Sequence, residues 1–384
     1  MIFTLISAFL FTGYALLITA ISIGWWRLKV FTETELPNEV KVSVIVAVRN
    51  EEKNIELLLK SLLSQKYPVH LLEICIVDDH SSDTTSSMVE DFITRKKEFK
   101  NLKFIALGAN DGSGKKAAIE RGIQASEGEL IIITDADCTA HSLWISSTVA
   151  YYALHKPQMI LGPVCMTSNG SLFGKLQSLE FISLISSAAG SCNAGFPILA
   201  NGANMAFTRN AYNICGGFSG NMQFPSGDDM FLMMNIKRQF GAKSIRFLRS
   251  EEAIVYTQAT IGFHAFIQQR LRWVSKSRGY TDPVLIVASI LVFLTNGWLV
   301  CTVFMAIFYP AYFNLLLIAY LIKMFIDLPL MFSFGHFQKN KSLFWLFPLM
   351  ELLNAVYTLL IGIAGNVGKY EWKGRRISNK GVER

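Results

Sequence analysis

The sequence predicts an α/β domain built on an open, Rossmann-like sheet, with one transmembrane helix before it and transmembrane or interfacial helices after it. Strand-like apolar runs alternate with helical patterns between residues 42 and 135, which is typical of a doubly wound parallel sheet. Apolar stretches also occupy Ile2–Trp26 and most of residues 283–365, with segments long enough to cross a bilayer. The mean hydropathy of +0.34 agrees with a chain that combines a soluble domain with membrane segments.

Five successive segments follow from these changes in composition. They are an N-terminal transmembrane anchor at 1–28, the α/β domain at 40–260, an amphipathic interface helix at 261–281, C-terminal membrane segments at 283–366 and a basic tail at 367–384. Between the apolar stretch Ile2–Trp26 and the one that begins at Pro283, apolar and charged residues are mixed throughout.

The N-terminal segment Ile2–Trp26 carries no charged side chain, and the first charges after it are Arg27 and Lys29. A cleaved signal peptide is the alternative, but it would need a basic start, a shorter apolar core and a small-residue cleavage site. These are missing, and Trp25-Trp26 is typical of a membrane interface. We therefore expect a retained anchor in the cell inner membrane, with the following domain in the cytoplasm.

Within the α/β domain, β-branched apolar runs predict strands, and apolar side chains at helical spacing predict helices. The predicted strands of the first half are Val42–Ala47, Ile74–Val77, Lys103–Ala106 and Leu130–Ile133. The predicted helices are Glu51–Ser64, a helix ending near Phe99, Lys115–Ala125, Ser171–Ala189 and Met230–Phe240. No G-x-G-x-x-G is present, so a nucleotide would not be held as NAD is.

The segment Gly262–Tyr280 combines an apolar face with several cations. The apolar residues are Phe263, Ile267, Leu271 and Val274. This pattern predicts an amphipathic helix at the membrane surface, just before the membrane segments.

Net charge and cysteine usage exclude several classes of protein. The net charge of +7 suits a surface that faces anionic lipids and a nucleotide diphosphate, and we expect no nucleic-acid partner. The six cysteines are scattered without a C-x-x-C pair, which argues against a disulfide framework or a structural zinc site. A reduced cytoplasmic domain agrees with this usage.

The stretch Asp135-Ala136-Asp137 places two carboxylates just after the predicted strand Leu130–Ile133. Open α/β sheets bind ligands at the carboxyl ends of their strands. Carboxylate oxygens in this arrangement suit Mg²⁺ or Mn²⁺ held between the protein and a substrate diphosphate.

Five motifs with chemically useful residues follow one another along the chain. They are Val48-Arg49-Asn50-Glu51-Glu52, Val77-Asp78-Asp79-His80-Ser81, Asp135-Ala136-Asp137, Gly227-Asp228-Asp229 and Gln269-Arg270-Leu271-Arg272-Trp273. In these motifs, from about Val42 to Trp273, the chain resembles the family-2 glycosyltransferases. The resemblance implies a GT-A catalytic domain that is inverting, uses a nucleotide-sugar donor and depends on Mg²⁺ or Mn²⁺.

The resemblance also implies a place for each residue on the donor side. Asp79 matches the contact to the nucleotide base, Glu51, Lys115 and Asp135 lie in the donor pocket, and Asp135 and Asp137 would hold the metal. The alternative for Asp79 and for Glu51 is turn and cap chemistry, and for Lys115 it is a solvated lysine at a helix end.

Asp229 matches the general base that the family uses on the acceptor, and Asp228 stands where the family often has Glu. The alternative for both is a pair of acids that cap a helix.

Gln269, Arg272 and Trp273 resemble the family's Q-x-x-R-W motif. Arg272 can face a diphosphate with its fork of donors, and Trp273 can stack on the acceptor or the sugar. An ordinary snorkelling Arg/Trp pair at a membrane interface is the alternative.

In size and in its single N-terminal anchor, the chain resembles ceramide-glucosyltransferase-like and carotenoid-glycosyltransferase-like members. We therefore expect transfer of one sugar, with a UDP-sugar favoured as donor, to a membrane lipid. A processive polysaccharide synthase of the same family is the alternative, although about four apolar segments offer little for a polymer channel. A non-enzymatic nucleotide-binding membrane protein or a transporter is a further alternative. Lys323 and Asp327, which lie inside an apolar segment, would be the evidence for a transporter. An internal ion pair between them is the simpler interpretation.

The topology cues at the C-terminus disagree. Three full spans after a cytoplasmic domain would leave the tail outside, but its many basic residues favour the cytoplasm. The segment Leu343–Gly365 contains Pro348, Glu351 and Asn354, so we expect it to be re-entrant or interfacial and the tail to be cytoplasmic. The stretch Tyr370–Arg375 resembles a Trp-Lys/Arg-Gly-Arg ending of lipid-directed members, with a basic juxtamembrane tail as the alternative.

Overall fold

Two compact units make up the structure, a computed structural model that describes residues 2–32, 40–96, 99–221, 224, 226–367, 369–378 and 381–382. The sheet unit comprises Lys29–Met166, Leu199–Gln258 and Glu371–Arg384. The helical unit comprises Met1–Leu28, Thr167–Ile198 and Ala259–Tyr370. The units therefore interleave along the chain, whereas the sequence predicts a linear series of segments.

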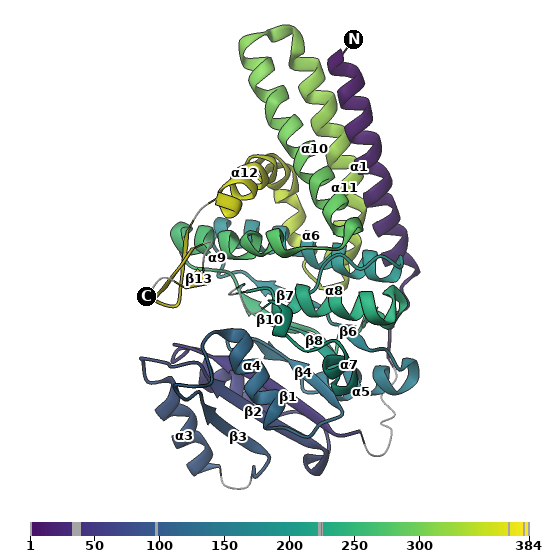
Figure 1. Ribbon diagram of the computed structural model, residues 1–384. Helices are drawn as coiled ribbons and strands as arrows, with labels where there is room; N and C mark the ends of the chain where they lie inside the picture. Colours follow the sequence, from purple (N-terminus) through teal and green to yellow (C-terminus); the bar gives the residue numbers. More distant parts are fainter. Residues whose placement is uncertain are drawn as a thin grey trace. The chain divides into compact units, whose positions relative to one another are not determined.

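A seven-stranded sheet forms the core of the sheet unit (Figure 1). Its order is β3 (Leu102–Ala106), β2 (Leu72–Asp78), β1 (Val42–Val48), β4 (Leu130–Ile133), β8 (Met205–Thr208), β6 (Met159–Leu161) and β9 (Ile245–Phe247). The first four strands run parallel, which confirms the doubly wound arrangement expected for residues 42–135. Strand β8 then runs antiparallel to both of its neighbours, so the complete sheet is mixed.

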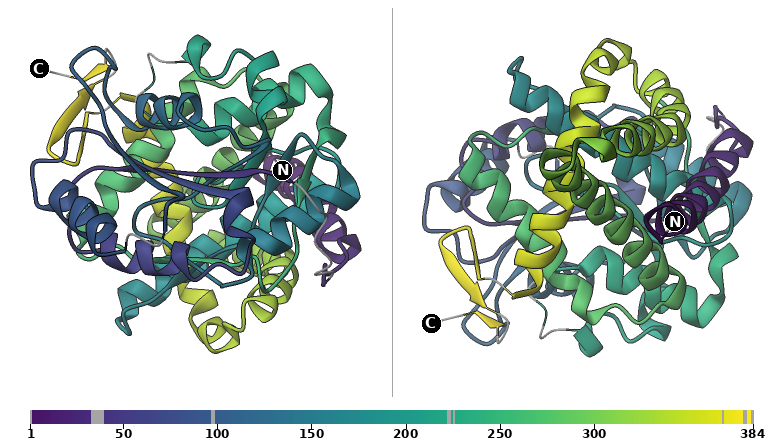
Figure 2. Two further views of the ribbon diagram at one scale, coloured as in Figure 1. Left: turned by 90° about the horizontal axis from the view of Figure 1, so that it is seen from below. Right: turned by 90° about the horizontal axis from the view of Figure 1, so that it is seen from above.

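Helices cover both faces of this sheet (Figure 2). Because both faces are covered, successive residues of β1 are buried regardless of the side to which they point, as Val44, Ile45 and Val46 show. The helices of this unit are α2 (Ile55–Leu63), α3 (Thr85–Arg95), α4 (Lys115–Gln124), α5 (Trp144–His155), α7 (Arg209–Ile214) and α8 (Asp228–Phe240). Helix α4 approaches the sheet closely at Gly122, where an added Cβ would lie 2.5 Å from the Ile45 side chain.

Two small sheets complete the strand inventory of the described residues. One contains β5 (Thr139–Ala140), β10 (Val255–Gln258) and β7 (Val164–Thr167). The other contains β11 (Tyr370–Trp372), β12 (Arg375–Ser378) and β13 (Gly381–Val382), and it lies in the segment predicted as a basic tail. Of the tail's basic residues, Lys380 and Arg384 lie outside the described residues.

The helical unit contains six α-helices among the described residues. They are α1 (Ile2–Arg27), α6 (Leu172–Asn193), α9 (Phe263–Ser275), α10 (Pro283–Phe308), α11 (Phe313–Phe337) and α12 (Phe347–Val367). Within the part of the chain that the structure describes, four helical segments are long and apolar enough to cross a membrane: Ile2–Arg27, Pro283–Phe308, Pro310–Phe337 and Lys341–Asn366. Helices α1, α10 and α11 lie side by side (Figure 1).

Helix α6 belongs with these helices, although its residues fall inside the predicted α/β domain 40–260. The reason is a close crossing with α1 at two glycines. An added Cβ at Gly24 would lie 2.0 Å from the carbonyl oxygen of Gly190, and one at Gly190 would lie 2.2 Å from that of Ile21. Backbones this close require residues without side chains at the crossing, and no local pattern in either segment reveals the partner.

Helix α12 (Phe347–Val367) covers most of the segment that we expect to be re-entrant or interfacial, and a 3₁₀ helix (Lys341–Leu346) covers its start. Pro348 is the second residue of α12, where proline is tolerated because the missing N–H has no helical partner to lose. Glu351 is buried rather than exposed to the surroundings. Two of the three sequence signals against a full span, Pro348 and Glu351, therefore have a local explanation. The re-entrant or interfacial arrangement stays a prediction.

A buried ion network joins three of the apolar helices. Lys323 of α11 donates to Asp327 (2.8 Å) and to Glu351 of α12 (2.5 Å), and the Tyr14 hydroxyl of α1 donates to Asp327 (2.8 Å). Lys323 is 1% exposed. The internal ion pair between Lys323 and Asp327 is confirmed, and Glu351 is an additional partner.

Replacing Lys323 with Met should destabilise the protein by about 3–5 kcal/mol, because two buried carboxylates lose their cation. Thermal unfolding of the purified protein in detergent measures this change. Lys60→Met is the control, since Lys60 forms an exposed pair with Glu56 (2.7 Å) and such pairs contribute about 0–1 kcal/mol. Equal shifts in melting temperature for the two variants would contradict the assignment.

Candidate active site at the carboxyl edge of the sheet

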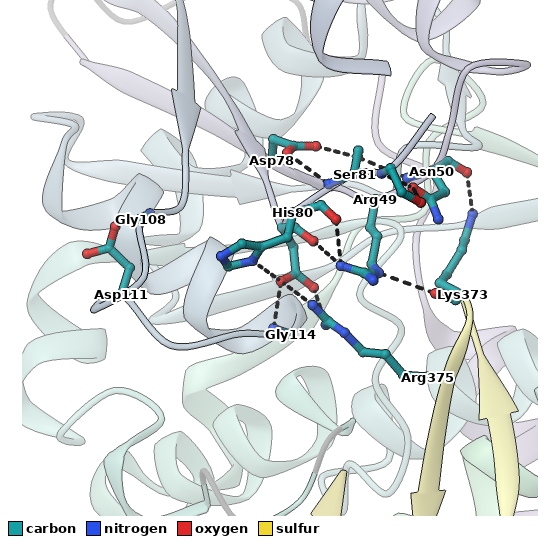
Figure 3. A network of polar contacts seen from close by, with 12 residues as sticks. Arg49, Asn50, Asp78, His80, Ser81, Gly108, Asp111, Gly114, Lys373 and Arg375 are labelled. Atoms are coloured by element: carbon teal, nitrogen blue, oxygen red, sulfur yellow. Dashed lines mark hydrogen bonds and ion pairs between the residues drawn. The ribbon is translucent and has the colours of Figure 1, made fainter. Parts of the chain in front are cut away.

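The loops after β1 and β2 form one hydrogen-bonded pair at the carboxyl edge of the sheet (Figure 3). The parallel register places Val48 beside Asp78, so the first two motifs emerge together. The Asn50 N–H donates to the Ser81 hydroxyl (3.0 Å), and the Ser82 N–H donates to the Asn50 side-chain oxygen (2.8 Å). Asn50 adopts a left-handed backbone (φ 50°), which asparagine tolerates better than most residues.

Asp79 lies buried between these loops and has several donors. Its carboxylate accepts from the Gly114 N–H (3.0 Å) and from both terminal nitrogens of Arg375 (2.7 and 3.1 Å). Burial alone would raise the pKa of Asp79, but the hydrogen bonds from Arg375 and Gly114 outweigh it and lower the pKa. The side chain is 2% exposed, so the carboxylate predicted to contact a nucleotide base faces protein donors here.

Glu51 also accepts from inside the protein. Its carboxylate receives the Lys373 ammonium (2.8 Å) and the Asn54 amide (2.8 Å), and its backbone N–H donates to the Thr85 hydroxyl. The turn chemistry considered for Glu51 is therefore present, together with a lysine partner from the far end of the chain.

Lys115, the first residue of α4, joins two of the motifs. Its ammonium lies 2.5 Å from Asp135 and 3.3 Å from Asp228. Burial would lower the pKa of Lys115, but the two carboxylates raise it well above its usual range. Lys115 is therefore not a solvated lysine at a helix end. Gly202 packs beside the pair, since an added Cβ there would lie 3.0 Å from the Lys115 nitrogen.

The acids of the fourth motif occupy the first turn of α8. The N-cap residue is Gly227 (φ 91°), which leaves Asp228 and Asp229 inside the helix and not at the cap. Asp228 is buried against Lys115, whereas Asp229 is half-buried and accepts from the Met230 N–H (2.7 Å). Asp228 and Asp229 therefore differ in solvent exposure, and a substrate can reach the Asp229 carboxylate more easily.

Asp135 and Asp137 fit a divalent metal that also binds a substrate. The described residues contain no cluster of three or more His, Cys, Asp or Glu side chains that could hold a metal alone. Two carboxylates at the edge are the set that Mg²⁺ uses when substrate phosphates supply further oxygens. Although Asp137 reaches solvent, partial burial together with Asp135 and Glu51 raises its pKa to about 6, and a bound cation would relieve this crowding of negative charge.

The loop Asn201–Asn204 is a turn with a structural anchor. The Asn204 amide donates to the carbonyls of Pro163 and Ala253 (2.8 Å each) and accepts from the Trp144 indole (2.9 Å). Asn204 is buried, so it holds the loop in place and does not face a ligand.

The Q-x-x-R-W residues belong to the helical unit, on α9. The Gln269 side-chain oxygen accepts from the Thr260 hydroxyl (3.0 Å) and from Arg270. Arg270 is 1% exposed, forms a two-pronged ion pair with Glu180 and lies 4.1 Å from the Trp273 ring centre. Arg272 and Trp273 are half-buried. The donor-side roles of Gln269, Arg272 and Trp273 stay predictions.

The structure thus brings five of the predicted residues together in the sheet unit: Glu51, Asp79, Lys115, Asp135 and Asp137. Asp229 directly follows Asp228, the second acid that Lys115 contacts. The sequence reasoning missed Lys373 and Arg375 as members of this site. The signal was present in the Trp372-Lys373-Gly374-Arg375 stretch, but its distance along the chain from the other motifs gave no reason to place it here.

Comparison with known proteins relates part of the chain to glycosyltransferases. Residues 43–217 match the family model described as "Glycosyl transferase family 2". The chain is 32% identical over 115 residues to a beta-monoglucosyldiacylglycerol synthase of Trichormus variabilis, a match that covers 30% of this chain and 24% of that one. It is 31% identical over 150 residues to a poly-beta-1,6-N-acetyl-D-glucosamine synthase of Staphylococcus epidermidis, covering 38% and 33%.

A solved structure, the mannosyltransferase PcManGT from Pyrobaculum calidifontis in complex with GDP-Man and Mn²⁺, superimposes with a TM-score of 0.57 at 19% identity. The superposition covers 91% of this chain and 99% of that one, which shows a shared GT-A fold. Residues 43–217 therefore resemble the domain that defines family-2 glycosyltransferases, within a chain that shares the GT-A fold. The matched part spans only about a quarter to a third of the length of the curated relatives.

Proposed function

We propose that this protein is an inverting membrane glycosyltransferase that moves one sugar from a nucleotide-sugar donor to a membrane lipid with the help of Mg²⁺ or Mn²⁺. The observation that carries the proposal is the bridge from Asp135 through Lys115 to Asp228. This bridge holds Asp135, one of the two acids that suit a metal-bound diphosphate, next to the first turn of α8, which carries Asp229.

The residues divide the chemistry between them. Asp229 would take the proton from the acceptor hydroxyl as that oxygen attacks the anomeric carbon from the side opposite the leaving group, which inverts the configuration. Asp135 and Asp137 would hold the metal, which neutralises charge on the departing nucleoside diphosphate. Lys115 keeps Asp135 and Asp228 fixed before substrate arrives, so less reorganisation accompanies the reaction.

A lipid acceptor is favoured by the membrane character of the same chain. Among the described residues, four helical segments are long and apolar enough to span a bilayer, and their most apolar windows carry at most two charged side chains each. Their buried ion network is satisfied internally by Lys323, Asp327, Glu351 and Tyr14, so it offers little to line a polar conduit. The synthase relative of Trichormus variabilis is named for a glycolipid product. We further propose a cytoplasmic catalytic domain at the inner membrane, as the charges after the first helix favour.

A processive polysaccharide synthase is the second candidate, because the relative from Staphylococcus epidermidis is named for a polymer product. It would need a path for the polymer across the bilayer. The preference for a UDP-sugar over a GDP-sugar stays a prediction, since the superimposed mannosyltransferase holds GDP-Man.

Asp229→Asn should slow sugar transfer by roughly 10²-fold or more, the scale of a lost general base, with little change in donor binding. Asp228→Asn is the matched neighbour. It should raise the KM for the donor, because Lys115 loses one of its two carboxylates. Steady-state kinetics with each purified variant measure both effects. A loss of donor affinity in Asp229→Asn as large as the loss of rate would move Asp229 into the donor pocket.

The product separates the two candidates. Purified protein in lipid vesicles, supplied with excess donor from a panel of UDP- and GDP-sugars, should release nucleoside diphosphate only when divalent metal and lipid are present. A single glycolipid band is the expected product. A ladder of long, alkali-resistant and lipid-free polysaccharide would replace the lipid proposal with the polymer one.

A further inference from the structure

A hairpin near the C-terminus reaches the candidate donor pocket. Strands β11 and β12 are joined by Lys373 and Gly374, whose φ angles of 48° and 76° are both left-handed. A two-residue turn of this type joins antiparallel strands with the least distortion, and glycine suits its second position. The turn and the residue after it belong to the sheet unit, together with the loops after β1 and β2.

Three side chains attach the turn to those loops (Figure 3). The Lys373 ammonium donates to the carboxylate of Glu51 (2.8 Å) and to the backbone carbonyl of Asn50 (3.0 Å). Arg375 grips the Asp79 carboxylate with both terminal nitrogens, and Arg49 donates to the Lys373 carbonyl (3.3 Å). Each of the first two motifs therefore holds one cation of the hairpin.

The edge of the sheet needs these cations if it is to receive a diphosphate. The four motifs in the sheet unit are rich in carboxylates, and Arg49 is their only cation. Arg49 donates to the backbone carbonyls of Asp79 and His80, and Lys115 is held between two acids. A nucleoside diphosphate would meet repulsion here unless the proposed metal and further cations offset the carboxylates, since like charges in a partly buried site are poorly screened.

Arg375 has donors to spare for such a ligand. A guanidinium carries five N–H donors, and within the described part of the chain Arg375 directs hydrogen bonds to Asp79 alone. Its side chain is 15% exposed, whereas the Asp79 side chain beneath it is 2% exposed. The surface that a ligand can reach is thus the arginine, and the aspartate supports it from behind.

The arginines also lie close enough to repel one another. Burial, and then the positive charge of Arg375, lower the pKa of Arg49. An anion bound at both groups would relieve this repulsion, as phosphate groups commonly do between arginines.

We propose that Lys373 and Arg375 form part of the donor site and bind the diphosphate of the nucleotide. Glu51 and Asp79 are then positioning residues that aim these two cations. The proposal rests on the proposed glycosyltransferase function, and it deepens that function by assigning the diphosphate contacts to a hairpin outside the domain matched by the family model.

Nucleotide binding tests the proposal independently of transfer. Isothermal titration of the full-length protein in detergent, with Mn²⁺ present, compares UDP and GDP with UMP and GMP. Arg375→Ala should raise the Kd of the preferred nucleoside diphosphate about 10-fold or more, the effect of one lost charge-assisted phosphate contact. The Kd of the matching monophosphate should change by less than about threefold, which a general loss of structure would not produce.

Two further variants complete the set. Arg375→Lys keeps a charge opposite Asp79 but loses the fork, so it should fold and show an intermediate Kd. Lys103→Ala is the control. It removes a lysine–glutamate pair of similar length, Lys103 to Glu73 at 2.9 Å, near the opposite end of β2, and should leave both Kd values unchanged. Equal diphosphate binding by wild type and both Arg375 variants would overturn the inference alone, whereas a wild type that binds no nucleoside diphosphate would overturn the proposed function as well.

Hydrogen exchange on the wild type shows whether the β11–β12 hairpin binds the nucleotide or blocks its site. If the hairpin binds the diphosphate, its backbone amides should exchange more slowly when the nucleotide is added. If the hairpin occupies the nucleotide's own place, ligand must displace it, and the same amides would exchange faster. Faster exchange, or tighter nucleotide binding by Arg375→Ala, would reject the proposal in favour of autoinhibition.

Discussion

The architecture of the site depends on holding many carboxylates close together at one sheet edge. Parallel strands deliver Glu51, Asp79 and the pair Asp135 and Asp137 to that edge, because each acid follows the end of its strand. Unit charges a few ångströms apart in a partly buried place repel by several kcal/mol, so the fold must supply counter-charges. Lys115 does so within the domain, and the superimposed mannosyltransferase carries Mn²⁺.

The same constraint explains why the C-terminal hairpin belongs to the sheet unit. Lys373 pairs with Glu51 and Arg375 pairs with Asp79, and Lys115 contacts neither of these acids. The pKa of Asp79 is lowered although the side chain is buried, because Arg375 and Gly114 donate hydrogen bonds to its carboxylate. The helical unit contains a similar arrangement in apolar surroundings, where Lys323 forms ion pairs with both Asp327 and Glu351. In each of these two networks a buried charge has more than one partner of the opposite charge or more than one hydrogen-bond donor.

The sequence allowed the prediction of features encoded by local pattern. The strand Leu130–Ile133 and the acids after it are recognisable because four apolar residues end abruptly at polar ones, and the parallel half of the sheet follows from strand–helix alternation. The antiparallel strand β8 has only four residues, too few to show a period, and its direction is set by its neighbours. The grouping of α6 with the apolar helices depends on the crossing of Gly24 and Gly190, a contact between distant segments.

The individual site residues also fall into those that a local motif identifies and those that depend on a contact with a distant segment. Asp135, Asp137 and Asp229 could be proposed because each follows a motif of fixed spacing, whereas Arg375 could not, since its partner Asp79 stands 296 positions away in sequence. Lys115 was ambiguous in sequence because a lysine at a helix start has no local signature of a buried bridge. The two carboxylates that surround it come from the end of β4 and from α8.

The central claim is that Asp135 and Asp137 hold a divalent metal that binds the donor's diphosphate. Titration of the full-length protein with nucleoside diphosphate, in Mn²⁺ and in chelator, tests it most directly when wild type and Asp137→Asn are compared. We predict that Mn²⁺ strengthens binding to the wild type and that this gain is lost in Asp137→Asn, while the variant melts at nearly the same temperature. An undiminished gain from Mn²⁺ in the variant, or wild-type binding that does not depend on metal, would contradict the claim.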